Sequence, residues 1–153
     1  MTGAAPPPGG GARPVAPRDG GPARGAVAVI VNPRGELLLH LRDDIEHIAW
    51  PGHWSVLGGG CDPGEDPRTA IVRELREEAG LEVDDPTALF DVTDVHGSGQ
   101  LLTVFLATWE GDAATLPLGE GVELRWFAPG DLARLTMPPF IRRALERYLA
   151  DHA

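Results

Sequence analysis

Apolar runs separated by short polar segments fill the chain from residue 26 onward, and their spacing predicts strands. The runs AVAVIVN and ELLLHLR are joined by NPRG, whose Asn, Pro and Gly favour a tight turn, so residues 26–42 are predicted to form a hairpin. A loop then leads to a short strand at WSVLG. The runs TALFDVTDVH and QLLTVFLATW flank Gly-Ser-Gly and predict a second hairpin, and VELRWFAP predicts one more strand.

Other segments have the spacing and the end signals of helices. Asp66 can cap a helix that Pro67 opens and that Gly80 ends in the left-handed conformation. The run GDLARL predicts a short helical turn, and residues 138–152 place one apolar stripe at helical intervals: Phe140, Ile141, Ala144, Leu145, Tyr148 and Leu149. Strands and helices do not alternate as βαβ units. The predicted class is therefore α+β, a mixed sheet packed between helices.

Composition divides the chain into a tail and one domain. Residues 1–25 are dominated by Gly, Pro and Ala, so they are predicted to be a disordered tail ahead of a domain at 26–153. The single Cys61 excludes an internal disulfide, fits a reducing compartment, and has no nearby His to activate it as a nucleophile. No run has the length of a membrane span. We therefore expect a cytoplasmic protein with no membrane partner.

The net charge of the chain limits the kinds of ligand that it can bind. The formal net charge is −10 at pH 7, which argues against binding a nucleic-acid polymer, because such binding rests on Lys and Arg neutralising phosphates. A phosphorylated small molecule would need cations to mediate its contact with so acidic a chain. The question becomes where the sequence could hold a cation.

Glu74, Glu77 and Glu78 gather on one side of the helix predicted between Asp66 and Gly80. Like charges three or four residues apart destabilise a helix by a few tenths of a kcal/mol per pair, roughly. A divalent cation such as Mg²⁺ or Mn²⁺ would reverse the sign of that effect. The alternative is a solvated helix face on which Arg73 pairs with Glu77.

The stretch GGGCDPGEDPRTAIVRELREEAGL resembles the Nudix box, G-x5-E-x7-R-E-U-x-E-E-x-G-U, in which U is aliphatic. Two departures lie outside the fixed positions: Leu57 stands where proline is common, and Asp62 replaces a frequent glutamate. The resemblance extends over residues 26–152 and implies the Nudix fold. Every fixed position of the box is filled, by Gly59, Glu65, Arg73, Glu74, Leu75, Glu77, Glu78, Gly80 and Leu81.

This resemblance implies a MutT-like hydrolase. The expected reaction is metal-dependent hydrolysis of a diphosphate linkage in a nucleoside diphosphate-X or a nucleoside triphosphate, with Mg²⁺ or Mn²⁺ as cofactor. Arg73 would orient the acidic side chains. The residues that the resemblance places around the metal are Gly58, through its carbonyl, with Glu65, Glu74, Glu77 and Glu78.

The general base stays open between three glutamates. Glu74 is the base in some family members, whereas in others the base comes from a loop nearer the C-terminus, where Glu120 and Glu123 stand. Glu120 is the preferred of those two, because it lies in a Gly-rich loop rather than in the predicted strand. For substrate binding, Arg42 matches a position that reaches phosphates, and Trp50 has a ring that can stack on a base.

Two further functions compete with this interpretation. One is a ligand-binding or regulatory protein that kept the fold and lost catalysis, although such proteins typically lose box carboxylates that are all present here. The other is a hydrolase of a non-nucleotide diphosphate metabolite. The expected partner is a small phosphorylated molecule, with a nucleotide preferred, and a homodimer is compatible with the resemblance.

Overall fold

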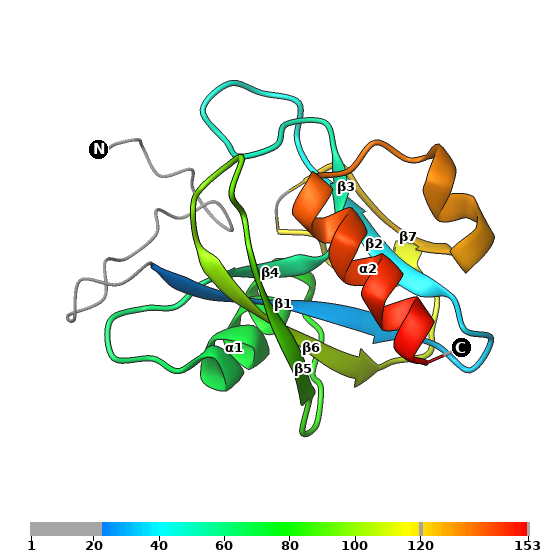
Figure 1. Ribbon diagram of the computed structural model, residues 1–153. Coiled ribbons are helices and arrows are strands. Elements are labelled where there is room, and N and C mark those ends of the chain that lie inside the picture. The colour runs from blue at the N-terminus through cyan, green and yellow to red at the C-terminus, as the bar shows by residue number, and fades with distance from the viewer. Residues whose placement is uncertain (1–22, 120, 153) are drawn as a thin grey trace.

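The computed structural model describes residues 23–119 and 121–152 of the chain. Within these residues, strands of one mixed sheet occupy the centre and helices lie on either side of it (Figure 1). The helices are α1 (Pro67–Ala79) and α2 (Pro139–Asp151), with 3₁₀ turns η2 (Ala113–Thr115) and η3 (Pro129–Arg134). The strands are β1 (Arg24–Val31), β2 (Leu37–Leu41), β3 (Trp54–Ser55), β4 (Leu57–Gly60), β5 (Thr87–Thr93), β6 (Leu101–Thr108) and β7 (Glu123–Phe127).

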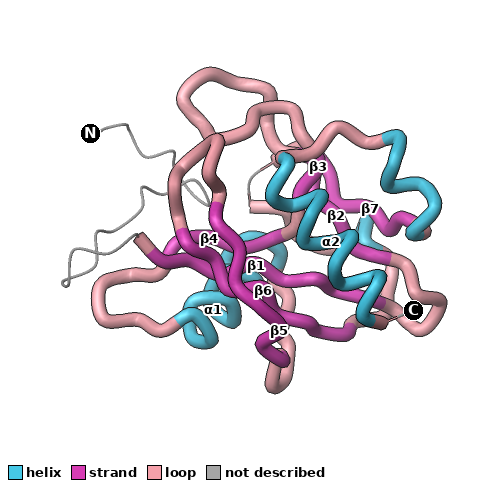
Figure 2. Tube along the Cα trace, in the orientation of Figure 1, coloured by secondary structure: helices cyan, strands magenta, loops and turns pink. Residues whose placement is uncertain are grey.

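Strand β1 is the centre of the sheet. It runs parallel to β6 along its whole length, from Arg24 opposite Leu101 to Val31 opposite Thr108. Its first half also pairs antiparallel with β4. The main path through the sheet is β3-β2-β1-β6-β5, and β7 pairs with β2 (Figure 2). Within residues 23–119 and 121–152, the sheet is therefore mixed, with one parallel pair among antiparallel ones.

Each face of the sheet is covered by one helix. Alternate residues of β1 point to opposite faces, so Ala26 and Ala28 pack in the cluster that contains α1, whereas Val27 and Val29 pack in the cluster that contains α2. Helix α2 contributes the predicted stripe, with Leu149 only partly buried at its end. The predicted α+β class, a sheet between helices, is confirmed.

The ends of α1 lie where the sequence predicts them. The Asp66 carboxylate accepts a hydrogen bond from the Thr69 amide at 2.8 Å, which satisfies one of the free N–H groups of the first turn. Pro67 opens the helix. Gly80 has φ 65° and ψ 21°, the left-handed conformation that favours glycine, and its N–H bonds to the carbonyl of Arg76.

The two predicted hairpins have different outcomes. Strands β5 and β6 form the second one, with an irregularity between Ala88 and Phe90. The first is correct only at its turn, because β1 and β2 pair at Val31 and Leu37 and then diverge. Strand β2 pairs instead with β7, and β1 with β4 and β6. Strand β1 also begins at Arg24, two residues before the predicted boundary.

The remaining elements follow the prediction with small differences. The run WSVLG contributes to β3 and β4, VELRWFAP contains β7, and all of GDLARL except its last residue, Leu135, lies in η3, while η2 was not predicted. Among the described residues, no helix combines the length and the apolar character that a membrane crossing requires. All but the last three residues of the predicted tail, 1–25, lie outside the described part of the chain.

Candidate active site

Helix α1 packs directly on the glycines of β4, and that contact places two carboxylates. Glu78 Oε1 accepts a hydrogen bond from the Gly58 amide at 3.0 Å. The Glu74 carboxylate lies over Gly59, where an added Cβ would come within 2.6 Å of Glu74 Cδ. A Cβ at position 58 would lie 2.2 Å from the carbonyl oxygen of Ala26. Glycine at 58 and 59 therefore allows helix, strand β4 and strand β1 to come this close.

Glu74 and Glu78 are buried, although the sequence places them on a different side of the helix from its apolar residues. Their exposed fractions are 5% and 4%, although the apolar side of α1 is formed by Ala70, Ile71, Leu75 and Ala79. The buried surface of the helix is thus wider than its apolar stripe and includes two acids. Buried acids need polar partners, and both residues have interactions with neighbouring groups.

Arg73 connects the acidic side chains to one another. Its Nε and Nη2 donate to the two oxygens of Glu65, both at 2.8 Å, in a bidentate pair. Its Nη1 donates to Glu74 and to Glu77, both at 3.0 Å, and Nη2 also donates to the carbonyl of Gly60 at 3.1 Å. One guanidinium thus contacts three of the box glutamates, and its role in orienting them for catalysis stays a prediction.

These contacts set the local protonation states. The hydrogen bonds from Arg73 hold the pKa of Glu65 below its ordinary value, and the bonds to Glu65 and Glu74 raise the pKa of Arg73. Burial raises the pKa of the Cys61 thiol, so at neutral pH this side chain stays protonated. The carboxylate of Glu65 is therefore charged at neutral pH, and Cys61 is a poor nucleophile, as the sequence indicates.

The carboxylates of Glu74, Glu77 and Glu78 suit a hard divalent cation, but they do not converge into a complete metal site. Glu77 is 59% exposed and within reach of solvent, while Glu74 and Glu78 lie beside it, all of them carboxylates of the kind that Mg²⁺ and Mn²⁺ prefer. Across residues 23–119 and 121–152, no three acidic, His or Cys side chains already converge on one point. Arg73 contacts Glu74 through Oε2 alone and Glu77 through Oε1 alone, so it holds each of these carboxylates by one oxygen.

The loop that follows η2 contacts the C-terminal part of α1. The Gly119 amide donates to the Glu78 carbonyl at 2.8 Å, and the Gly121 amide donates to the Asp43 carboxylate at 3.1 Å. Glu120, a predicted general base, lies outside the described residues, between these two anchors in sequence. Asp43 was not singled out from the sequence, because nothing in its neighbourhood signals a contact 78 residues away.

Glu123 is held on the other side of the sheet. Its carboxylate accepts a hydrogen bond from Arg125 Nε at 2.8 Å, and Arg125 lies over the rings of Trp54 and Phe127. Glu123, Arg125 and Phe127 share one face of β7, and Phe127 packs in the cluster of α2. Leu124 and Trp126 lie on the opposite face and pack in the cluster of α1. Glu123 thus points away from the face on which Glu74 and Glu78 lie.

The two predicted substrate-binding residues belong to one loop, residues 42–53. Arg42 Nε donates to the carbonyl of Ala49 at 2.6 Å, so the guanidinium closes this loop. The Trp50 ring lies edge-on to His53, with centroids 5.4 Å apart, and packs against the cluster of α2. These contacts tie Arg42 to its own loop and Trp50 to the core, and the role of both residues in substrate binding stays a prediction.

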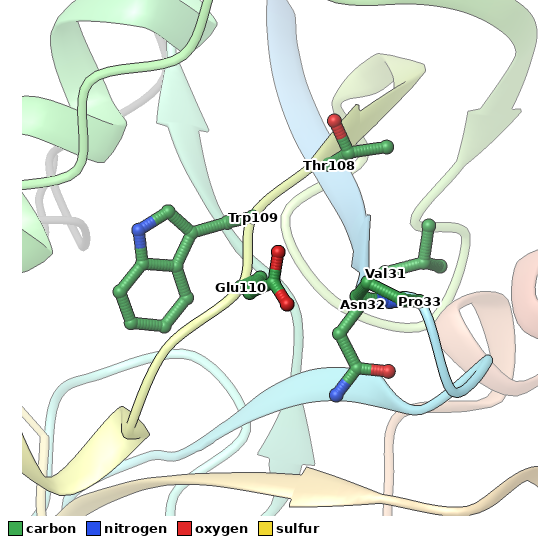
Figure 3. A pocket seen from close by; sticks show the side chains of 6 residues that line it. All are labelled: Val31, Asn32, Pro33, Thr108, Trp109 and Glu110. Atoms are coloured by element: carbon green, nitrogen blue, oxygen red, sulfur yellow. The ribbon is translucent and has the colours of Figure 1, made fainter.

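A surface pocket lies elsewhere in the fold. It has a volume of about 290 Å³ and forms where β1 and β6 end (Figure 3). Gly58 to Gly60 pair with the opposite end of β1, so this pocket is separate from the carboxylates. The residues that line it are Val31, Asn32, Pro33, Thr108, Trp109 and Glu110.

Comparison with known proteins places this arrangement in a family. The family model described as NUDIX domain matches residues 21–148. The CTP pyrophosphohydrolase of Escherichia coli is 30% identical over 130 residues, which are 83% of this chain and 92% of that protein. A Mycobacterium tuberculosis protein named as putative 8-oxo-dGTP diphosphatase 3 is 33% identical over 101 residues, or 63% of this chain, and the match spans 46% of that relative.

Solved structures agree on the fold. A MutT protein from Methanosarcina mazei superposes with a TM-score of 0.73 over 84% of this chain and 94% of that one, at 24% identity. Similarity at this level of identity shows the fold, and the family match covers most of the chain. The chain therefore has the Nudix fold and belongs to the Nudix family.

Proposed function

We propose that this protein hydrolyses a diphosphate linkage in a nucleoside triphosphate or a nucleoside diphosphate-X, in the MutT-like manner, with Mg²⁺ or Mn²⁺ as cofactor. The observation that carries the proposal is the Arg73 cluster, in which one guanidinium contacts Glu65, Glu74 and Glu77 beside the Glu78–Gly58 bond. The names of the relatives in E. coli and M. tuberculosis support a nucleotide as the substrate.

Within this proposal, the cation would be held by Glu74, Glu77 and Glu78 together with the carbonyl of Gly58. When bound, it would act as a Lewis acid that neutralises charge on the phosphate oxygens, which favours attack of water on phosphorus. Glu65 is less suited to bind it directly, since Arg73 occupies both of its oxygens. Its part is to fix the guanidinium, and through it the carboxylates.

The proton of the attacking water would be taken by Glu74 or Glu120. Glu74 is supported by its position, buried at the junction of α1 and β4. Glu120 follows Gly119, whose amide binds the carbonyl of Glu78. Glu123 is disfavoured because Arg125 pairs with it on the opposite face. The pH dependence of kcat in Glu74→Gln and Glu120→Gln separates the two remaining candidates, since loss of the base removes the acidic limb of the profile.

The direct test is turnover of a substrate panel. Wild-type protein is incubated with Mg²⁺ or Mn²⁺ and nucleoside triphosphates, 8-oxo-dGTP, nucleotide sugars, ADP-ribose or dinucleoside polyphosphates, and the products are separated by chromatography. We expect hydrolysis of one substrate class, its loss with EDTA, and a fall of at least about 100-fold in Glu77→Gln, since metal carboxylates act on the transition state.

Glu82→Gln is the matched control. It removes the same charge five residues away, from an exposed pair with Arg76, and should retain wild-type turnover. Turnover unaffected by EDTA and by Glu77→Gln would contradict the proposal. Activity confined to a non-nucleotide diphosphate would replace the nucleotide assignment, and a folded protein that binds nucleotide without turnover would support a regulatory role.

A further inference from the structure

Two segments far apart in the sequence meet at one hydrogen bond. The indole N–H of Trp50 points between the two oxygens of the Asp94 carboxylate, at 3.2 and 3.3 Å. Trp50 belongs to the loop after β2, and Asp94 begins the turn between β5 and β6, 44 residues later. These two segments also lie side by side at the top of the fold, in the ribbon and in the tube drawn in the same orientation (Figures 1 and 2).

Asp94 is built into its turn as an acceptor. Its exposed fraction is 3%, and its Oδ2 accepts from the amide of Ser98 at 2.9 Å and from the Ser98 hydroxyl at 3.3 Å. Its carbonyl accepts from the amide of Gly99 at 2.9 Å. A Cβ at Gly97 would lie 2.3 Å from Asp94 Oδ2 and 2.7 Å from Trp50 Nε1, so the turn closes tightly over the indole contact. A buried carboxylate with these donors is a fixed anchor.

The loop of Trp50 needs such an anchor. Local bonds close its base, from the Arg42 amide to the His53 carbonyl and from the Gly52 amide to the Asp43 carbonyl. Trp50 itself has φ 52°, in the left-handed region that a bulky residue rarely adopts. Such a conformation persists only where surrounding contacts fix it. The hydrogen bond to Asp94 fixes the Trp50 side chain to a residue outside the loop.

The anchored loop and the turn of Asp94 each lie near segments that carry the candidate active site. Asp43, at the base of the loop, accepts from Gly121, two residues after the amide that binds Glu78. A Cβ added at Gly25 would lie 2.8 Å from the carbonyl oxygen of Gly59 and 3.2 Å from Nε2 of Gln100, so the end of the turn lies near the strand that carries the box glycines. The Trp50–Asp94 bond therefore joins the two segments that flank the box.

We propose that Asp94 is a positioning residue for substrate recognition, which acts by holding the Trp50 indole and the 42–53 loop in their binding conformation. The inference rests on the proposed function, and it assigns recognition of the nucleoside part to a preformed loop rather than to the carboxylates. A preformed loop lowers the entropy that substrate binding must offset. Removing the anchor then weakens binding and leaves the chemical step intact.

The test compares Asp94→Ala, Asp94→Asn, Trp50→Phe and the double variant Asp94→Ala/Trp50→Phe on the best substrate of the wild type. We expect KM to rise roughly tenfold in Asp94→Ala, as for loss of a hydrogen bond to a charged acceptor, while kcat changes less than about twofold. Asp94→Asn keeps one oxygen for the indole and should restore part of the KM. The double variant should have the KM of Trp50→Phe alone, because Asp94 acts through that indole.

Asp91→Ala is the control, since Asp91 lies on the same hairpin and its carboxylate accepts from Thr103 rather than from the loop. Hydrogen exchange of the 42–53 amides gives a second readout, which should rise in Asp94→Ala and stay unchanged in α1. An active wild type with unchanged KM in Asp94→Ala, additive effects in the double variant, or unchanged exchange would each overturn the inference alone. A wild type inactive on the whole panel would overturn the proposed function, and the inference with it.

Discussion

Glu78 of α1 accepts a hydrogen bond from the amide of Gly58 in β4, at 3.0 Å, across a sequence separation of 20 residues. This bond fixes the helix on the strand that leads into the box. It also brings a buried carboxylate beside the backbone that the resemblance assigns to a metal. The close approach of α1 and β4 is therefore the structural basis of the candidate site, and the first prediction tests it.

Replacement of Gly59 by Ala should disable the site by displacing Glu74. The new Cβ would lie 2.6 Å from Glu74 Cδ, so the carboxylate or the helix must shift. We expect kcat to fall at least about 100-fold and the free energy of unfolding to fall by about 1–3 kcal/mol, as for overpacked interiors. Gly130→Ala, where a Cβ meets nothing within 4 Å, is the control. Steady-state kinetics and urea unfolding measure both effects, and wild-type kcat in Gly59→Ala would show that Glu74 is not needed in its observed place.

Arg73→Lys should lose activity although the charge is kept. Lysine cannot form the bidentate pair with Glu65 while also reaching Glu74 and Glu77. We expect a fall in kcat of about 10- to 100-fold, the range seen when groups that orient metal ligands are lost. Arg76→Lys, in an exposed pair with Glu82, should keep wild-type kcat. Equal kcat in the two variants would mean that the guanidinium geometry of Arg73 does not matter.

The Glu65–Arg73 pair should make stability depend on pH in the acid range. The folded-state pKa of Glu65 is held below its ordinary value of 4.5 by the hydrogen bonds from Arg73. Its contribution to stability is therefore present above 4.5 and is lost as the pH falls through the lower folded-state value. The difference in unfolding free energy between wild type and Glu65→Gln, measured by urea titration in EDTA, should be largest near neutral pH and shrink below pH 4.5. A difference that stays constant or grows on acidification would refute this linkage.

The elements governed by local sequence could be predicted. The ends of α1 follow from Asp66 and Gly80, which cap a helix through contacts within a few residues. The β5–β6 hairpin follows from two apolar runs across a Gly-Ser-Gly turn. The box residues Glu65 and Arg73 are only eight residues apart, with Glu65 in the loop just before α1 and Arg73 within the helix.

The elements that depend on distant segments could not be predicted. The apolar pattern of β1 shows that both of its faces are buried, but it does not identify β4 and β6 as neighbours in place of β2. The burial of Glu74 and Glu78 arises from the close approach of β4, which helical periodicity does not report. The Trp50–Asp94 bond joins residues 44 positions apart with no sequence signal.

The measurement that tests the central claim most directly is Mn²⁺ binding to the purified protein, followed by the loss of the free-ion electron paramagnetic resonance signal. It requires no knowledge of the substrate. We predict that wild type and Glu82→Gln bind Mn²⁺ alike, and that Glu77→Gln binds it at least about tenfold more weakly, because it lacks one hard oxygen ligand. Equal Mn²⁺ affinity in Glu77→Gln and Glu82→Gln, or no binding by the wild type, would contradict the assignment of a metal to this helix.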